Sequence, residues 1–120
     1  MEIQTLLASK GAKKIMIDYE SGIPVGLNFL LSCPQGEIPI RLPARIENVR
    51  KILKNSAPRS IYENAEKIAW RNIKDWVDAQ IALVETEMVS TQEVFLSYMI
   101  MGEKTLFENF TDGQLKLKSA

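Results

Sequence analysis

The stretch Ser60–Met88, SIYENAEKIAWRNIKDWVDAQIALVETEM, decides the fold that we expect for this chain. Its apolar residues recur at the spacing of an amphipathic helix, and neither glycine nor proline interrupts it. Ser60 and Glu63 have the spacing of a capping box, in which each side chain accepts a hydrogen bond from a backbone N–H of the first turn. The apolar arc covers roughly 200° of the helix circumference, wider than one packing partner requires. We therefore predict one long central helix that packs against two neighbouring elements.

Three polar residues lie within or beside this apolar arc, namely Asn72, Gln80 and Glu87. Buried polar groups normally have hydrogen-bond partners, so one interpretation is that a neighbouring element or water satisfies them. The other interpretation is a pocket or a subunit seam in which they act as recognition groups. The sequence leaves both interpretations open.

The residues before the central helix predict three strands connected by short turns. The predicted strands are Lys14–Tyr19, Val25–Ser32 and Glu37–Leu42. Pro39 has no backbone N–H, so the third strand is expected at an edge of the sheet. The simplest arrangement of these strands is an antiparallel meander. Met1–Ala8 fits either a fourth strand or a first helical turn.

Further helices are predicted on both sides of the central one. Pro43 suits the first turn of a helix, because an N–H would have no partner there, and Ala44–Lys54 then shows apolar residues at helical spacing. Two more capping boxes follow, Ser90 with Glu93 and Thr105 with Glu108. The first predicts a helix over Ser90–Met101 that Gly102 ends. The second predicts a short helical turn near the C-terminus.

These patterns predict an α+β fold, in which an antiparallel sheet is followed by a helical half that covers one of its faces. At 120 residues the chain is expected to form a single domain (1–120), with about 1–42 in the sheet and 43–120 helical. No apolar run is long enough to cross a bilayer, so we expect no membrane association. The N-terminus lacks the residue order of a signal peptide, and a single cysteine fits a reducing compartment. We therefore expect a cytoplasmic protein.

The chemistry available to the chain is narrow, because it contains no histidine and one cysteine, Cys33. Histidine is the commonest general base and metal ligand, so its absence argues against a catalytic triad and a zinc site. Cys33 adjoins a turn and has no histidine to activate it, which favours an incidental role. The six glycines are scattered, not gathered in a phosphate-binding loop. We expect no enzyme activity, no metal and no cofactor.

Charge is unevenly distributed although the formal net charge is zero. Residues 1–60 hold 9 basic and 5 acidic side chains, or +4, and residues 61–120 hold 6 and 10, or −4. The basic edge, as we call the densest group, comprises Arg41, Arg45, Arg50, Lys51, Lys54 and Arg59. It suits nucleic-acid phosphates or an acidic protein surface, or it is simply the solvated face of a helix. The opposite halves also suggest a homodimer, with Tyr98–Met101 as a candidate seam.

Ala69–Gln80 carries the pattern A-W-R-x-x-K-D-W-x-x-A-Q, and Glu93–Leu96 and Thr105–Glu108 supply two further segments. On these segments, and on Gly11–Phe29, the chain resembles a family of small proteins from bacterial viruses and other mobile elements. The resemblance covers most of the chain and implies an accessory protein, which either blocks a host defence system or assists replication or recombination. It implies no catalytic residue.

Three functions stay open at this point. The leading hypothesis is a non-catalytic accessory protein that occupies a surface of a host protein and inhibits a defence or nucleic-acid-processing system. Its contacts would be the basic edge and the polar residues within the apolar arc of the central helix. The second is a DNA- or RNA-binding factor that uses the basic edge, although zero net charge weighs against it. The third is a small-molecule binder with a pocket near Gln80 and Glu87.

Overall fold

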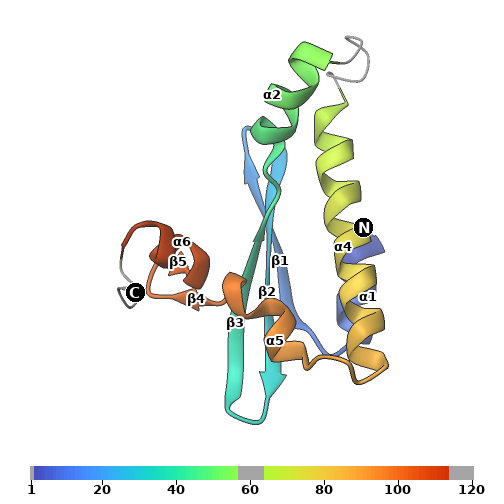
Figure 1. Cartoon of the computed structure of the whole chain (residues 1–120), viewed down its shortest axis with the longest axis vertical. Helices are drawn as coiled ribbons and strands as arrows, with labels where there is room; N and C mark the ends of the chain where they lie inside the picture. The colour runs from blue at the N-terminus through green and yellow to red at the C-terminus, as the bar shows by residue number, and fades with distance from the viewer. Residues whose placement is uncertain (1, 57–63, 114–120) are drawn as a thin grey trace, which may run out of the picture.

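The computed structural model describes residues 2–56 and 64–113, and it has an α+β architecture (Figure 1). Its N-terminal part is a three-stranded antiparallel sheet in the order β1-β2-β3, as the meander predicts. The strands are β1 (Lys13–Glu20), β2 (Ile23–Cys33) and β3 (Gly36–Pro43). The predicted capping box at Ser60 and Glu63, the basic residue Arg59 and the C-terminal QLKLKSA all lie outside the described residues.

The third strand is an edge strand of the sheet, as Pro39 predicts. The prediction that Pro43 opens a helix is wrong. Pro43 is the last residue of β3 and pairs with Gly26, and the next backbone N–H, that of Ala44, donates to the carbonyl of Val25 at 2.8 Å. This hydrogen bond keeps the chain extended, so helix α2 (Ile46–Ser56) begins after it.

The N-terminal segment is a helix, α1 (Glu2–Ser9), so the alternative of a fourth strand is wrong. Ile3 and Leu7 explain the choice, because each is 2% exposed and their spacing of four places both on one face of a helix. In a strand the same two residues would lie nearly 14 Å apart, too far to pack in one small pocket of the core.

The central helix α4 spans Ala65–Glu85, shorter at both ends than the stretch that predicts it. It packs against α1, α2 and the short helix α5 (Thr91–Phe95), and its buried Val77 joins the core of the sheet. The prediction of two packing partners is therefore confirmed and exceeded. No helix among the described ranges is long and apolar enough to cross a membrane.

The predicted helix Ser90–Met101 is correct only in its first half. After α5 the chain makes one 3₁₀ turn, η1 (Leu96–Tyr98), and then turns extended because Met99 bridges Ile40 at the outer edge of β3. A small hairpin follows, β4 (Ile100–Met101) with β5 (Lys104–Thr105), and then α6 (Leu106–Thr111). Both predicted capping boxes here, at Ser90 and at Thr105, are confirmed.

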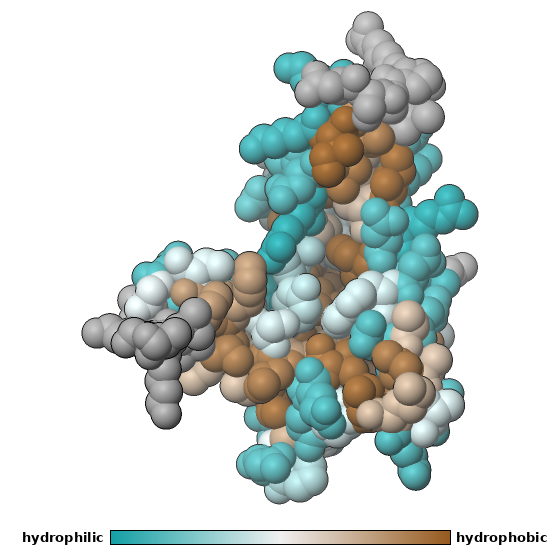
Figure 2. Space-filling model, viewed as in Figure 1, coloured by the Kyte–Doolittle hydropathy of each residue, from teal (hydrophilic) through white to brown (hydrophobic). Residues whose placement is uncertain are grey.

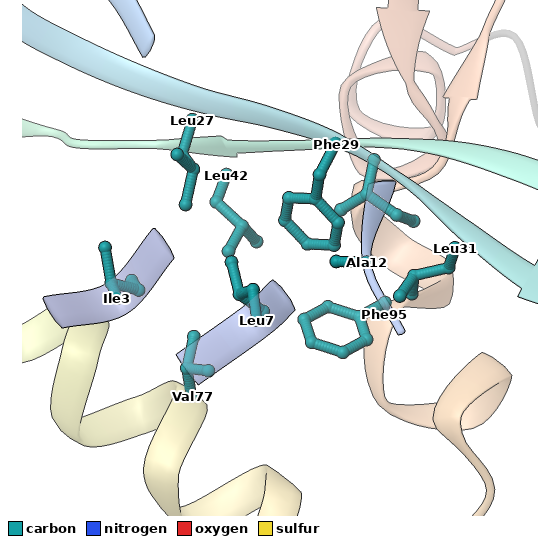
Figure 3. Packing of buried hydrophobic residues seen from close by; sticks show 10 residues of the cluster. Ile3, Leu7, Ala12, Leu27, Phe29, Leu31, Leu42, Val77 and Phe95 are labelled. Carbon is teal, nitrogen blue, oxygen red and sulfur yellow. The ribbon is translucent and has the colours of Figure 1, made fainter. Parts of the chain in front are cut away.

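The core lies between one face of the sheet and the helices (Figure 3). Figure 3 shows Leu27 and Leu42 extending from the strands toward Leu7 of α1 and Val77 of α4. Phe95 of α5 closes the same core. Within the described residues, helices cover only this face, so the opposite face of the sheet carries half-buried polar side chains and the exposed Met16.

Candidate protein-binding surface

Arg41 of the basic edge lies in a row of polar side chains across the open face of the sheet. Asn28 donates from Nδ2 to Asp18 Oδ2 at 2.5 Å, and Arg41 donates from Nε to Asn28 Oδ1 at 3.2 Å. Arg41 also donates from Nη1 to the backbone carbonyl of Glu103, at 3.3 Å. The three side chains come from adjacent strands, and Asn28 and Arg41 are direct cross-strand neighbours. Arg41 therefore links the sheet to the C-terminal hairpin within the chain.

The other arginines of the basic edge also have contacts inside the chain. The guanidinium of Arg45 lies over the ring of Phe107, 5.7 Å from its centroid, within the range of a cation–π interaction. Arg50 forms an ion pair with Glu47 of the same helix. Lys51 and Lys54 are exposed on α2, and neither has an ion pair within residues 2–56 and 64–113. Among the described residues of the basic edge, Arg41 and Arg50 are therefore engaged by polar partners, whereas Arg45, Lys51 and Lys54 are exposed and have no ion pair in that part of the chain.

The C-terminal unit, meaning residues 100–111 that form β4, β5 and α6, lies beside the outer edge of β3 (Figure 1). It presents three exposed apolar side chains: Met101 is 47% exposed, and Phe107 and Phe110 are each 41% exposed. Phe107 and Phe110 are three residues apart on α6, so they are neighbours on its surface. We call these three residues, together with Arg45, the C-terminal ridge.

The C-terminal ridge is held by several local contacts. The Asn109 side chain donates from Nδ2 to the carbonyl of Met101 at 3.1 Å, and Lys104 forms an ion pair with Asp112. Thr105 is 3% exposed, and its hydroxyl accepts a hydrogen bond from the Glu108 N–H at 3.2 Å. These contacts tie the hairpin to both ends of α6. The C-terminal unit that carries the ridge is therefore held in its conformation by contacts within the chain, without a binding partner.

Electrostatics hold the same unit together. The backbone N–H of Thr105 donates to the Glu108 carboxylate and lowers its pKa; the Thr105 hydroxyl and the positive charges of Arg41 and Lys104 act in the same direction. The hydrogen bond to Asp112 raises the pKa of Lys104. Both groups are thus stabilised in their charged forms. Arg41 contributes to the C-terminal unit by its charge as well as by its hydrogen bond.

The polar residues of the central helix do not form one site. Asn72 lines an open pocket of about 170 Å³ whose other walls are Leu42, Pro43, Ile73, Trp76 and Tyr98. Gln80 is half-buried further along α4, and Glu87 lies beyond the end of the helix, exposed, with φ 63°. The pocket is smaller than the roughly 300–1,000 Å³ of typical small-molecule sites, so it suits a single side chain better than a metabolite.

Two aromatic rings form a corner of this pocket. The rings of Trp76 and Tyr98 lie 5.7 Å apart at 76°, and Trp76 makes a second edge contact with the buried Phe95. Trp76 therefore connects this corner of the pocket to the hydrophobic core. On the face shown in Figure 2, apolar residues extend from the C-terminal unit across to the region of α5.

Metal ligands do not gather in the described residues: no group of three His, Cys, Asp or Glu side chains is arranged to hold an ion there. The thiol of Cys33 donates to the carbonyl of Gly36 at 3.0 Å, inside the turn between β2 and β3. Sequence reasoning missed Phe107 and Phe110 as exposed aromatic residues. The available signal was two aromatic side chains in a helix of six residues that is too short to bury both.

Comparisons with family models, with curated proteins and with solved structures found no match to this chain. The function is therefore inferred from the C-terminal ridge and the charged groups around it.

Proposed function

We propose that this protein is a non-catalytic accessory protein of a bacterial virus or another mobile element, and that it acts in the host cytoplasm by binding a host protein through the C-terminal ridge. One observation carries the proposal: Phe107 and Phe110 are both 41% exposed on one short helix, with the guanidinium of Arg45 over the first ring. Aromatic residues, methionine and arginine are the types enriched in protein interfaces.

The local contacts that hold the C-terminal ridge in place support this proposal. Single exposed apolar residues are common on protein surfaces, but here three share a unit fixed by a capping box, an ion pair and a side chain to backbone hydrogen bond. A preformed contact surface loses little conformational entropy when it binds, so more of the contact energy appears as affinity. Large aromatic side chains in such positions typically dominate the binding energy.

The division of the basic edge favours a protein partner over nucleic acid. Arg50 is paired with Glu47 and Arg41 is half-buried in hydrogen bonds, so of these three arginines only Arg45 presents an exposed charge without an ion pair to the described residues. The resemblance to proteins of mobile elements suggests which partners to consider, namely components of a host defence or nucleic-acid-processing system. Inhibition by occupying a surface of such a component requires no catalytic residue in this chain.

The proposal is tested by capturing partners from host lysate, treated with nuclease, on tagged wild-type protein and on two variants. The double variant Phe107→Ser with Phe110→Ser removes both rings from the ridge. Met88→Ser is the matched control, because Met88 is 71% exposed and lies outside the ridge. We expect a stoichiometric host protein on the wild type and on the control, and its loss from the ridge variant with unchanged circular dichroism. Equal capture by all three proteins would exclude the ridge as the contact.

Direct binding to DNA or RNA is the second candidate, and the exposed Lys51 and Lys54 on α2 are the observation that favours it. Binding through these two lysines would weaken steeply as salt rises, because phosphate contacts release counterions. Fluorescence anisotropy with a labelled oligonucleotide would detect it, and Lys51→Glu with Lys54→Glu should abolish it. Salt-sensitive binding that this double variant removes, with the ridge variant unaffected, would replace the protein-binding proposal.

A further inference from the structure

Strand β1 has a free outer edge in the described part of the chain. The sheet order β1-β2-β3 places β1 and β3 at its two edges, and Met99 bridges Ile40 at the outer edge of β3. No strand within residues 2–56 and 64–113 pairs with the corresponding edge of β1. An edge of this kind exposes a row of backbone N–H and C=O groups, which can pair with another strand.

The charges along β1 have opposite signs at its two ends. The strand reads KKIMIDYE, so it starts with Lys13 and Lys14 and ends with Asp18 and Glu20. Lys14 and Glu20 are both exposed, and neither forms an ion pair with the described residues. Two copies of β1 that pair antiparallel about Ile17 bring the lysine end of each copy alongside the acidic end of the other. The extra residue of β1 between Lys13 and Met16 shifts the register there, so Lys13 and Lys14 together lie near Glu20 of the other copy. Parallel pairing would instead place like charges side by side, which disfavours it.

Exposed apolar side chains lie between these charged ends. Met16 is 61% exposed and Tyr19 is 62% exposed, although both belong to a strand of the sheet. A second β1 strand would lie next to them and cover part of each side chain. The two sheets would then form one continuous sheet of six strands, in the order β3-β2-β1-β1-β2-β3, with no free β1 edge.

Lysines and β-bulges are also the features by which edge strands avoid pairing, and β1 has both. Its register with β2 shifts between Lys13 and Met16, where Lys14 has φ 51°. Such protection discourages pairing with a foreign strand, because it buries unpaired lysine charges. It does not account for the opposite charge of Glu20 at the other end of the strand. A second copy of β1 brings this acid near the lysines, so the same charges that discourage other strands favour this partner.

We infer that the outer edge of β1 is a self-association surface, on which two copies of this chain pair antiparallel about a two-fold axis near Ile17. This location differs from the seam that the run Tyr98–Met101 suggests, since Met99 of that run already bridges Ile40 within the chain. The interface is isologous, so the contact between the lysine end of one copy and the acidic end of the other occurs twice.

Charge reversal tests this interface directly. Lys14→Glu places an acid at both position 14 and position 20, and Glu20→Lys places a lysine at both positions. Each variant alone replaces two attractions by two repulsions, so the dissociation constant of its homodimer should rise about tenfold or more. An equal mixture of the two should restore association, because each acidic strand then meets a basic one. Sedimentation velocity over a micromolar to millimolar concentration series, at low salt, measures all three samples and the wild type.

Pairing through β1 is supported if the wild type forms a dimer, each variant alone dimerises more weakly, and the mixture of the two variants recovers association. A wild type that stays monomeric across the series overturns it, and so does a dimer that neither substitution weakens. Circular dichroism confirms that both variants fold. Hydrogen exchange gives an independent readout, since amides at 13–20 should become more protected as the concentration of the wild type rises, while those of α2 should not change.

Discussion

The guanidinium of Arg45 lies over the ring of Phe107, 5.7 Å from its centroid. This contact joins the basic first half of the chain to the acidic second half, and it is one of several that do so. Arg41 donates to the carbonyl of Glu103, and Lys10 pairs with Glu85 at the end of α4. Part of the charge asymmetry between the halves is therefore satisfied inside the monomer, by the ion pair between Lys10 and Glu85.

The contact between Arg45 and Phe107 should orient α6. We expect Arg45→Gln to remove a cation–π interaction worth about 0.5–1 kcal/mol at an exposed site and to speed hydrogen exchange in α6. Lys54→Gln removes a charge of the same basic edge without an aromatic contact, so it serves as the control. Hydrogen exchange followed by mass spectrometry should show the change at residues 106–111 in the first variant only. An unaltered α6 in Arg45→Gln would mean that the hairpin and the capping box hold this helix without the arginine.

Asn28 should be the key residue of the polar row on the sheet. Asn28→Ala removes both hydrogen bonds that it makes and leaves Asp18 and Arg41 half-buried without that partner. We expect the free energy of unfolding to fall by about 1–3 kcal/mol, the cost of unsatisfied polar groups. Urea denaturation measures it. Ser32→Ala, at an exposed position on the same strand, should change it by less than about 0.5 kcal/mol.

Phe95 should contribute more to stability than its short helix suggests. It is 3% exposed and makes edge contacts with Phe29 and Trp76, each with ring centroids 5.7 Å apart. Phe95→Ala should cost about 3–5 kcal/mol through lost burial and the cavity that remains. Chemical denaturation should show this loss, together with altered tryptophan fluorescence. Leu96→Ala is the control because Leu96 is 49% exposed. Equal losses in the two variants would contradict the central place of Phe95 in the core.

The C-terminal unit should loosen in acid. The pKa of Glu108 is lower in the folded chain than in the unfolded one, so its carboxylate stabilises the fold at pH values above about 4.3, the ordinary value for glutamate. This contribution falls as the pH drops from there through the lower folded pKa. NMR spectra or limited proteolysis at neutral pH and near pH 3 should show residues 100–111 opening in acid. Glu108→Gln cannot gain or lose this charge, so its C-terminal unit should vary less with pH.

Local patterns in the sequence predict much of this fold. The three strands follow from the alternation of apolar residues between turns, and their antiparallel order follows from the shortness of those turns. The capping boxes at Ser90 and Thr105 involve atoms three residues apart, so they form wherever those residues start a helix. The central helix is likewise specified by its own periodicity, although its ends differ from the prediction.

The remaining features depend on residues that are distant in sequence. Met1–Ala8 is compatible with either type of structure by itself, and the packing of Ile3 and Leu7 into the core selects the helix. The helix after Ser90 stops early because Met99 bridges Ile40, a partner far back along the chain.

The basic edge shows the same contrast between what local sequence patterns specify and what contacts between distant residues specify. Its composition can be read from the sequence, but only the folded chain brings Arg41 to the carbonyl of Glu103 and Arg45 to the ring of Phe107. Hydrogen bonds and periodicity within a few residues are encoded locally, so the sequence by itself determined the strands and the central helix but not the type of the N-terminal segment. Contacts between distant residues form only when hydrophobic burial brings the elements together, so tertiary structure alone decided where helices end and which side chains face solvent.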